Sequence, residues 1–254
     1  MRNYASAQNI GGRSTQCDAT AVRTAPDGTR AYALLDGIGS SSEIRDWTRQ
    51  TAARLAARAA RRGDAETALR SLYDELAADP DRQDIYLRRY MPCAAAVVAV
   101  AVPGRPLTVA WAGDSRAYLL RRGIVQRLTN DHNLRRVYPP TATFPDGGNR
   151  NVITSFLGSA FTDEETRSRF NHPAIESATE PVVDGDRLVL ASDGAYEPHE
   201  EAGHDLVVEL GYEPLAPAVA GFVDLAVRTA RTARPEDEHH FVDNATALVA
   251  DLTL

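Results

Sequence analysis

The sequence predicts a layered α+β sandwich. Residues 94–129 alternate apolar runs with short turns, a pattern typical of antiparallel strands. Helical spacing of apolar residues precedes this segment at about 42–62 and returns after it near 204–210 and 216–233. Strand runs flanked by pairs of helices are expected to form sheets with helices packed outside. No internal repeat or low-complexity linker divides the chain, so residues 1–254 are expected to form one domain.

The N-terminal third is expected to contain two strands and then two helices. The strands lie near 18–23 and 30–35, on either side of a Pro-Asp-Gly turn. Apolar residues recur at helical spacing from about Ser42 to Arg62, and Gly63 is placed to end that helix. Asp64 is a good N-cap for the next helix, because its side chain can accept a hydrogen bond from the first turn.

The middle of the chain is expected to form a strand meander followed by a long irregular segment. The first strand, from Ala94, is apolar on both faces and should be buried between layers. A hairpin joins 116–121 to 124–129. From about 131 to 170 the pattern becomes polar and rich in Pro and Gly, as is common in a functional lid or flap. Strands are expected again at about 181–191 and at 245–252.

Composition restricts the classes of function. The net charge of −7 and the pI near 5.4 argue against nucleic acid as the main partner. All 28 basic residues are arginine. No apolar run is long enough to cross a membrane, the start lacks the apolar core of a secretory signal, and the two cysteines cannot supply a disulfide framework. We therefore expect a cytoplasmic, monomeric protein with no membrane partner.

Four short acidic motifs adjoin apolar, strand-like runs. Asp36, Asp114 and Asp193 each follow such a run, and Asp243 precedes one. A single Asp-Gly pair most often marks a turn. Because the ends of antiparallel strands can meet at one edge of a sheet, however, these acids can converge. Carboxylates are hard oxygen ligands suited to magnesium or manganese, so the pattern predicts a metal-dependent hydrolase.

The motifs, in this order, resemble those of the bacterial metal-dependent protein serine/threonine phosphatases of type 2C, the PPM family. The resemblance spans nearly the whole chain. The segments that carry it are Arg13-Ser14-Thr15-Gln16-Cys17-Asp18, Leu35-Asp36-Gly37-Ile38-Gly39, Ala112-Gly113-Asp114-Ser115-Arg116, Leu128-Thr129-Asn130-Asp131-His132, Ala191-Ser192-Asp193-Gly194 and Asp243-Asn244-Ala245-Thr246.

This resemblance implies a four-layer αββα sandwich with two metal ions, Mn²⁺ or Mg²⁺, at one end. Asp36 would bridge both ions, and the carbonyl of Gly37 would bind one of them. The remaining roles, carried over by position, are Asp193 and Asp243 at the first ion, Asp18 at the second through water, Asp114 at a third, weaker ion, and Arg13 on the substrate phosphate. A metal-bound hydroxide would then hydrolyse phosphoserine and phosphothreonine in proteins phosphorylated by a serine/threonine kinase in a signalling pathway.

Several departures from the family pattern leave a second reading open. Cys17 precedes Asp18 where many members have a polar residue, Ser40 replaces a glycine, and Ile38 stands where some animal members have histidine. The segment 91–94 reads Met-Pro-Cys-Ala in place of Met-Gly-Thr-Thr. The alternative is therefore a catalytically weak pseudophosphatase that binds phosphoproteins or scaffolds a kinase. A third reading keeps the enzyme and changes its substrate to a regulatory phosphoprotein of an anti-sigma pathway or a small phosphoester.

Other candidate residues have simpler explanations. His239 and His240 lie in an acidic loop beside Asp243 and are expected to face solvent, although a proton-donor role is compatible with their position. Cys17 is expected to be a buried, inert thiol. Asp131 and His132 are expected to support a turn.

Overall fold

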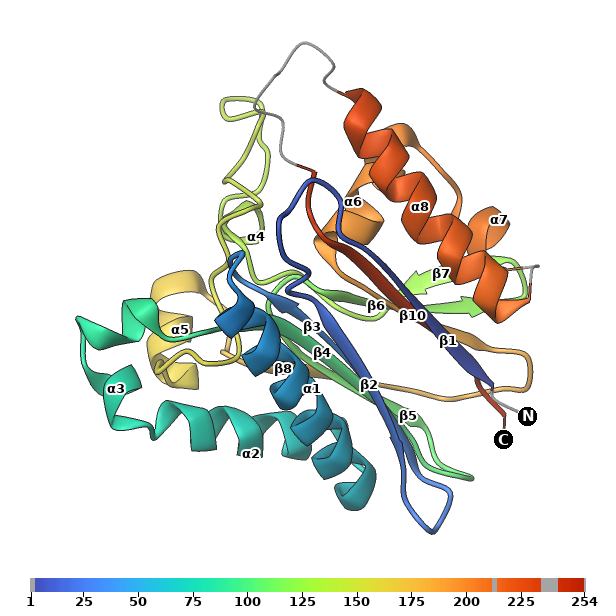
Figure 1. Ribbon diagram of the computed structural model, residues 1–254, viewed down its shortest axis with the longest axis horizontal. Coiled ribbons are helices and arrows are strands. Elements are labelled where there is room, and N and C mark those ends of the chain that lie inside the picture. Colours follow the sequence, from blue (N-terminus) through green and yellow to red (C-terminus); the bar gives the residue numbers. More distant parts are fainter. Residues whose placement is uncertain (1–2, 212–213, 234–241, 254) are drawn as a thin grey trace.

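Two antiparallel sheets stacked face to face form the centre of the molecule, with helices on both outer faces (Figure 1). The computed structural model describes residues 3–211, 214–233 and 242–253. The layers run helix, sheet, sheet, helix from one side to the other. The predicted four-layer α+β sandwich is therefore confirmed.

Each sheet has five strands. The first sheet has the order β2-β3-β4-β5-β8, formed by Ala19–Thr24, Arg30–Gly37, Ala94–Ala101, Leu107–Ala112 and Glu176–Glu180. The second has the order β1-β10-β9-β6-β7, formed by Tyr4–Asn9, Ala245–Asp251, Arg187–Ala191, Arg116–Arg121 and Ile124–Arg127. The chain passes from one sheet to the other several times, so strands that are distant in sequence become neighbours.

The helices cover the two outer faces. They are α1 (Ser42–Arg62), α2 (Ala65–Ala77), α3 (Pro80–Gln83), the 3₁₀ helix η1 (Leu87–Tyr90), α4 (Leu134–Val137), α5 (Asp163–Phe170), α6 (Asp193–Ala202), α7 (Leu206–Leu210) and α8 (Leu215–Ala233). Helices α1 and α2 pack on the first sheet, whereas α6 and α8 pack on the second. In the described part of the chain, no helix combines the length and the hydrophobicity needed to span a bilayer.

The first helix begins and ends where the sequence predicts, and the second begins where it predicts. The Ser41 hydroxyl accepts a hydrogen bond from the Ile44 N–H at 3.2 Å, which caps α1. Gly63 ends α1 in the left-handed conformation, with φ of 65°. The Asp64 carboxylate then accepts from the Thr67 N–H at 2.8 Å and caps α2.

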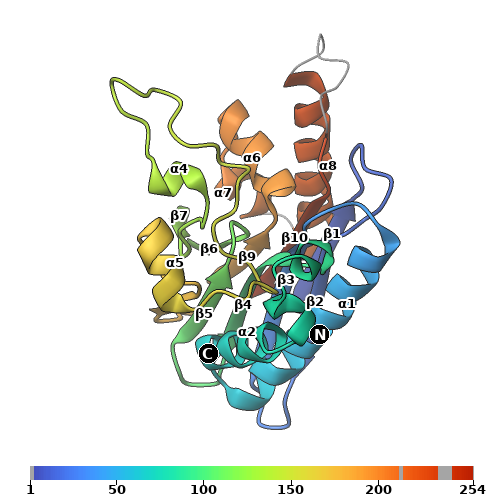
Figure 2. The same cartoon turned by 90° about the vertical axis from the view of Figure 1, so that its left-hand side faces the viewer.

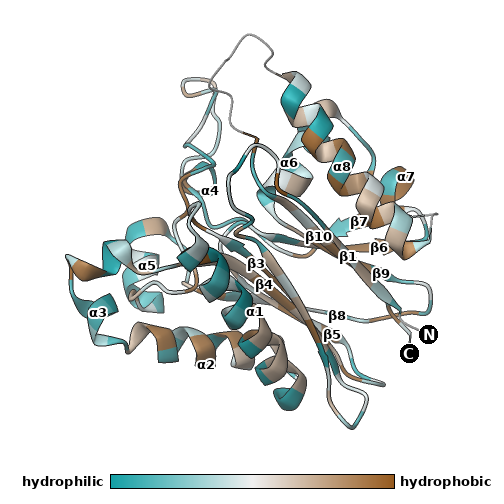
Figure 3. Cartoon of the chain, viewed as in Figure 1, coloured by the Kyte–Doolittle hydropathy of each residue, from teal (hydrophilic) through white to brown (hydrophobic). Residues whose placement is uncertain are grey.

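Three hydrophobic clusters fill the three spaces between the layers. On β3, Ala31, Ala33 and Leu35 face α1 and α2, whereas Tyr32 and Leu34 face the second sheet. This alternation follows from the period of two along a strand. The apolar colouring of the central strands in Figure 3 reflects their burial on both faces. The positions of the strand ends are thereby fixed by the packing of both sheets.

The structure also contains elements that the sequence pattern did not predict. Strand β1 was missed; it forms because residues 4–9 pair along their full length with β10. The strands predicted at about 181–191, broken by a turn at 184–186, are only partly found: β9 (187–191) forms after the turn, whereas the strand before it, β8, lies earlier, at 176–180. The segment 131–170 contains α4 and α5, and in Figure 2 the part around α4 extends from the same end of the sheets as α6.

Helix α6 is the most important correction, because Asp193 is the first residue of this helix and not simply a residue at a strand end. Gly194 and Pro198 concealed the helix, since Gly weakens helices and Pro lacks the N–H that the helix interior needs. Burial of Ala195, Tyr196 and His199 against the second sheet and α8 compensates for this poor local propensity.

We predict that Gly113→Ala lowers the free energy of unfolding by about 3 kcal/mol. Gly113 has φ of 124°, and a Cβ there would lie 2.4 Å from the Ala95 Cβ, within the neighbouring strand. Gly104→Ala is the matched control: it also has positive φ, 70°, but meets no atom within 4 Å, and should cost about 1 kcal/mol. Urea unfolding of both variants measures the difference, and equal losses would contradict this packing argument.

Candidate active site

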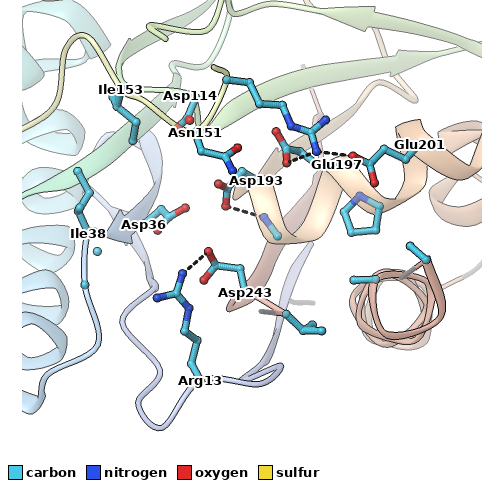
Figure 4. Close-up of a pocket in the computed structure, with 18 residues that line it drawn as sticks. Arg13, Asp36, Ile38, Asp114, Asn151, Ile153, Asp193, Glu197, Glu201 and Asp243 are labelled. Atoms are coloured by element: carbon cyan, nitrogen blue, oxygen red, sulfur yellow. Dashed lines mark hydrogen bonds and ion pairs between the residues drawn. The ribbon is translucent and has the colours of Figure 1, made fainter. Parts of the chain in front are cut away.

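Asp36 and Gly37 close strand β3 at one end of the sandwich. They pair with Ala95 and Ala94 at the start of β4. A side chain at Gly37 would clash with the Cys17 carbonyl oxygen and the Thr48 hydroxyl, both 2.6 Å from the position of its Cβ. Glycine is therefore required for α1 to pack closely behind this strand end, which holds Asp36 facing outwards from it (Figure 4).

Asp114 reaches the same end of the sandwich from the turn between β5 and β6. The positive φ of Gly113 allows this turn to pass against Ala95 on β4. The Tyr196 hydroxyl of α6 donates a hydrogen bond to the Asp114 carbonyl oxygen at 3.1 Å, which fixes the backbone. Asp114 is 3% exposed, and its Oδ1 has no hydrogen-bond partner among the described residues.

The second sheet contributes Asp193 and Asp243. Strands β9 and β10 are antiparallel neighbours, so the end of one lies beside the start of the other. The Asp193 carboxylate accepts from the Gly194 N–H at 2.6 Å, and the Asp243 carboxylate accepts from the Asn244 N–H at 2.7 Å. These local bonds orient both side chains toward Asp36, as Figure 4 shows.

Asp18 lies behind this group and is almost fully buried. The Ser192 hydroxyl donates a hydrogen bond to Asp18 Oδ2 at 3.1 Å. The same hydroxyl accepts from the Thr246 N–H at 3.0 Å, which ties the start of β2 to the second sheet. Burial, together with the nearby Asp193 and Asp243 carboxylates, raises the pKa of Asp18 to about 8.

Arg13 approaches from the loop between β1 and β2. Its Nη2 lies 2.6 Å from Asp243 Oδ2. The loop is held by the Gly12 N–H, which donates to the Val242 carbonyl at 2.8 Å, and by the Asn244 amide, which donates to the Ile10 carbonyl at 3.0 Å. Asn244 also accepts from the Cys17 N–H at 2.8 Å. Asp243 thus supplies a carboxylate to the site, and the amide of the adjacent Asn244 holds the loop between β1 and β2 in place.

A cavity of about 500 Å³ joins these side chains. Of the seven residues that the sequence predicts for the site, all but Asp18 line this cavity; they are Arg13, Asp36, Gly37, Asp114, Asp193 and Asp243. Residues 239 and 240, the two histidines considered as further candidates, lie outside the described residues. Cys17 is buried as expected, and burial raises the pKa of its thiol.

Electrostatic repulsion dominates the cavity. In the part of the chain that the structure describes, six carboxylates line it together with two arginines, Arg13 and Arg150. Burial and the neighbouring carboxylates raise the pKa of Asp36 and Asp114 well above the usual range, and they raise the pKa of Asp193 as well. As the side chains stand, no three carboxylate, histidine or cysteine groups among the described residues are close enough to hold a metal ion.

The departures from the family pattern perform structural tasks in the described chain. The Cys93 carbonyl accepts from the Ile38 N–H at 3.0 Å, and Ala94 bridges to Leu157 on the segment 131–170. Arg82 donates to the Pro92 carbonyl at 2.8 Å and to the Gly158 carbonyl at 2.6 Å. The unusual segment 91–94 is therefore hydrogen-bonded on both sides, and none of its residues lines the cavity.

Comparison with known proteins identifies the family. The family described as Protein phosphatase 2C matches residues 10–137, which include four of the motif segments quoted above. The chain belongs to the protein phosphatase 2C family. No curated protein matches its sequence.

Two solved bacterial phosphatases illustrate the likeness of fold. The S. agalactiae serine/threonine phosphatase is 20% identical with a TM-score of 0.74, over 98% of this chain and 99% of that chain. The Mycobacterium tuberculosis serine/threonine phosphatase PstP/Ppp is 21% identical with a TM-score of 0.67, over 99% and 98%. Membership of the family makes this chain a phosphoprotein phosphatase, in a family that depends on Mn²⁺ or Mg²⁺ in general.

The phosphatase cavity also contains residues that the sequence reasoning missed. Glu197 and Glu201 on α6, and Arg150 and Asn151 on the segment 131–170, line it with the predicted acids. Burial and the nearby Asp193 raise the pKa of Glu197 to about 8. The signal for Glu197 was its position one helical turn after Asp193, which becomes visible only once α6 is recognised as a helix.

We predict that the metal-free phosphatase loses stability as pH rises from 6.5 to 8. The folded-state pKa of Asp18, about 8, exceeds its unfolded value, so ionisation of Asp18 opposes folding throughout this window. Each such group contributes a loss of about 1.4 kcal/mol per pH unit. Burial lowers the pKa of His172 and His199 to about 4, so both are neutral in the folded protein. Their unfolded counterparts are about half protonated at pH 6.5 and lose that proton as pH rises, which offsets the loss of stability by about 0.4 kcal/mol for each histidine.

Urea unfolding in EDTA at both pH values measures this loss. Asp18→Asn should reduce the slope, because the amide cannot ionise. Mn²⁺ should restore stability by about 2.7 kcal/mol at a hundredfold excess over its Kd. Equal stability of the metal-free wild type at pH 6.5 and 8 would contradict the repulsion described here.

Proposed function

We propose that this phosphatase hydrolyses phosphoserine and phosphothreonine in proteins at a two-metal site built around Asp36. The observation that carries this proposal is the imbalance of charge in the cavity, where, among the described residues, six carboxylates face two arginines. A phosphate monoester is itself anionic and would be repelled by such a lining. Bound divalent cations would neutralise the carboxylates and so allow an anionic substrate to enter the cavity.

The donor set suits Mn²⁺ or Mg²⁺. Every candidate ligand is an oxygen atom, which both ions prefer, and the buried Oδ1 of Asp114 has no partner among the described residues that would have to be displaced. We assign the metal-holding role first to Asp36, which would serve two ions together with the Gly37 carbonyl, Asp193 and Asp243. Asp18 would support a second ion through water, and Asp114 would help to hold a third, weaker one.

The ions, when bound, would lower the pKa of a shared water and neutralise charge on the phosphoryl oxygens. The chain's own residues bind and orient the substrate. Arg13 sits at the edge of the carboxylate group, 2.6 Å from Asp243, and its guanidinium can hold phosphoryl oxygens through paired hydrogen bonds. Ile38 and Ile153 form apolar parts of the cavity wall on the side facing Asp36 and Asp114 (Figure 4).

The proposed substrates are proteins phosphorylated by a serine/threonine kinase. A cavity open to solvent at the end of the sandwich can accept a phosphorylated side chain while the rest of the substrate chain stays outside. Residues 1–254 would act as one catalytic domain, with the segment 131–170 as the flap beside the cavity.

We predict that Asp36→Asn lowers turnover of p-nitrophenyl phosphate and of a phosphothreonine peptide by about a thousandfold or more in Mn²⁺ or Mg²⁺. The amide cannot supply the shared charge, whereas the fold should persist because the substitution removes a repelled carboxylate. Asp74→Asn, at an exposed position on α2, is the matched control and should retain full turnover.

The outcomes separate the two readings of this chain. Turnover that requires Mn²⁺ or Mg²⁺ and disappears in EDTA and in Asp36→Asn supports the metallophosphatase. A folded wild-type protein that turns over neither substrate with any divalent ion would favour the pseudophosphatase. Wild-type turnover in Asp36→Asn would overturn the proposed mechanism.

We predict that Arg13→Ala raises KM for the phosphopeptide about tenfold to a hundredfold, the effect of losing charged hydrogen bonds. Arg13→Lys should fall between this variant and the wild type, because an ammonium retains the charge without the paired geometry. Steady-state kinetics at saturating Mn²⁺ measures KM. An unchanged KM in Arg13→Ala would remove Arg13 from the phosphate site.

A further inference from the structure

A second cavity, of about 570 Å³, adjoins the catalytic cavity and is rich in arginine. We call it the basic groove; its lining residues are Arg116, Arg127, Asn130, Asp131, Asn133, Arg135, Arg136, Arg150, Glu197 and Glu200. The two cavities share Arg150 and Glu197 in their linings. A molecule bound in the catalytic cavity can therefore extend directly into the basic groove.

The charge of the basic groove is opposite to that of the chain as a whole. Five arginines line it with three carboxylates, in a protein of net charge −7. Two of those carboxylates are engaged by Arg116, which is buried. Asp131 accepts two hydrogen bonds from Arg116, at 2.9 and 2.8 Å, and Glu200 accepts one at 2.5 Å. Arg127, Arg136 and Arg150 also pair with carboxylates, so Arg135 is the groove arginine that has no carboxylate partner among the described residues.

Arg135 provides the exposed cation of the basic groove. Its Nε donates to the Gly148 carbonyl at 3.4 Å, and no carboxylate among the described residues lies within ion-pair distance of it. Arg127, also exposed, shares Asp131 with Arg116. Arg150, between the two cavities, is held by Glu201 and by Glu197, the latter at 3.1 Å; the dashed lines at these two glutamates in Figure 4 mark the pairs.

The backbone that carries Arg135 is firmly anchored. Next to it, Arg136 pairs with Glu176 of β8 at 2.5 Å, and His132 Nε2 lies 2.9 Å from the same carboxylate. The His132 ring stacks on His172 with a centroid separation of 4.3 Å. The Asn133 side chain caps α4 by accepting from the Arg136 N–H. A cation on a fixed base loses less conformational freedom on binding than one on a loose loop.

We propose that the basic groove binds an anionic side chain of the phosphoprotein substrate close to the residue being dephosphorylated. The ligand chemistry is an oxyanion, supplied by an aspartate or glutamate or by a second phosphorylated residue. Arginine suits both, because its guanidinium pairs with two oxygens at once. This inference rests on the proposed function, since it concerns the substrate of the same site.

Matched phosphothreonine peptides test the proposal. One series carries a single aspartate or glutamate at each position on either side of the phosphothreonine, a second series carries phosphoserine, and a third carries alanine. At one or more positions an acidic residue should raise kcat/KM about tenfold over alanine, as expected for charge-assisted hydrogen bonds at a partly solvated site. Comparison of the first two series distinguishes carboxylate from phosphate as the preferred oxyanion.

The variants Arg135→Glu and Arg135→Gln test whether the preference for a flanking anion arises from the basic groove. We expect Arg135→Gln to remove the preference and Arg135→Glu to reverse it in favour of alanine. The ratio of kcat/KM values is taken within each variant, so a loss of active protein cancels. Arg49→Glu, at an exposed position on α1, is the matched control for the change in charge and should leave the ratio as in the wild type.

Hydrolysis of p-nitrophenyl phosphate, which has no flanking residue, distinguishes a failure of this inference from a failure of the proposed function. If wild-type protein turns it over but shows no preference for flanking anions, this inference is wrong and the proposed function stands. A preference that survives in Arg135→Glu would equally overturn the assignment to the groove. If p-nitrophenyl phosphate is not hydrolysed with any divalent ion, the proposed function fails and this inference fails with it.

Discussion

Mutual repulsion among buried carboxylates is the constraint on which the functional end of this molecule depends. Asp36 comes from one sheet and Asp193 and Asp243 come from the other, so stacking of the two sheets brings them together. The apolar clusters between the layers hold the strands in register, and the strand ends have no freedom to separate. Burial then raises the pKa of Asp36 and Asp193 because each charge is poorly solvated and close to others.

The residues around these carboxylates hold them in place but relieve their repulsion only in part. Hydrogen bonds from Ser192 and Asn244 frame the carboxylates without neutralising them. Arg13 compensates only part of the charge, through its pair with Asp243. A site built in this way stores unfavourable electrostatic energy in the free protein, and binding of cations would release it. Stability, metal binding and acceptance of an anionic substrate are therefore linked through the same few residues.

The proposed role of the basic groove adds a second electrostatic contact, between the groove and the substrate. The catalytic cavity is lined mainly by carboxylates and would be compensated by cations, whereas the groove beside it contains Arg135, an exposed cation with no carboxylate partner among the described residues. Arg150 and Glu197 lie where the two meet. A phosphoprotein with a further anion near its phosphorylated residue would be complementary to both regions, and a small phosphoester would use only the first.

Sequence reasoning recovered what local patterns and motif order determine. Helices α1 and α2 were predicted because their apolar spacing and the signals at Gly63 and Asp64 are local, whereas the N-cap Ser41 was seen only in the structure. Four aspartates were predicted to converge because each adjoins a strand, and all four line one cavity. Helix α6 and strand β1 were missed, since tertiary packing overrides the weak propensity of Gly194 and Pro198 and a distant partner strand forms the pairs of residues 4–9. Glu197 and the basic groove were missed for the same reason, because both depend on long-range contacts.

The most direct test of the central claim is anomalous X-ray diffraction from crystals grown with Mn²⁺. The account predicts two Mn²⁺ peaks in the catalytic cavity, both adjacent to the Asp36 carboxylate, with Asp193 and Asp243 at the first. Asp36→Asn crystals grown under the same conditions should lose at least one of these peaks. Crystals of a Mn²⁺-activated preparation that show no peak beside Asp36 would contradict the account, because activity would then not depend on the convergence of these carboxylates.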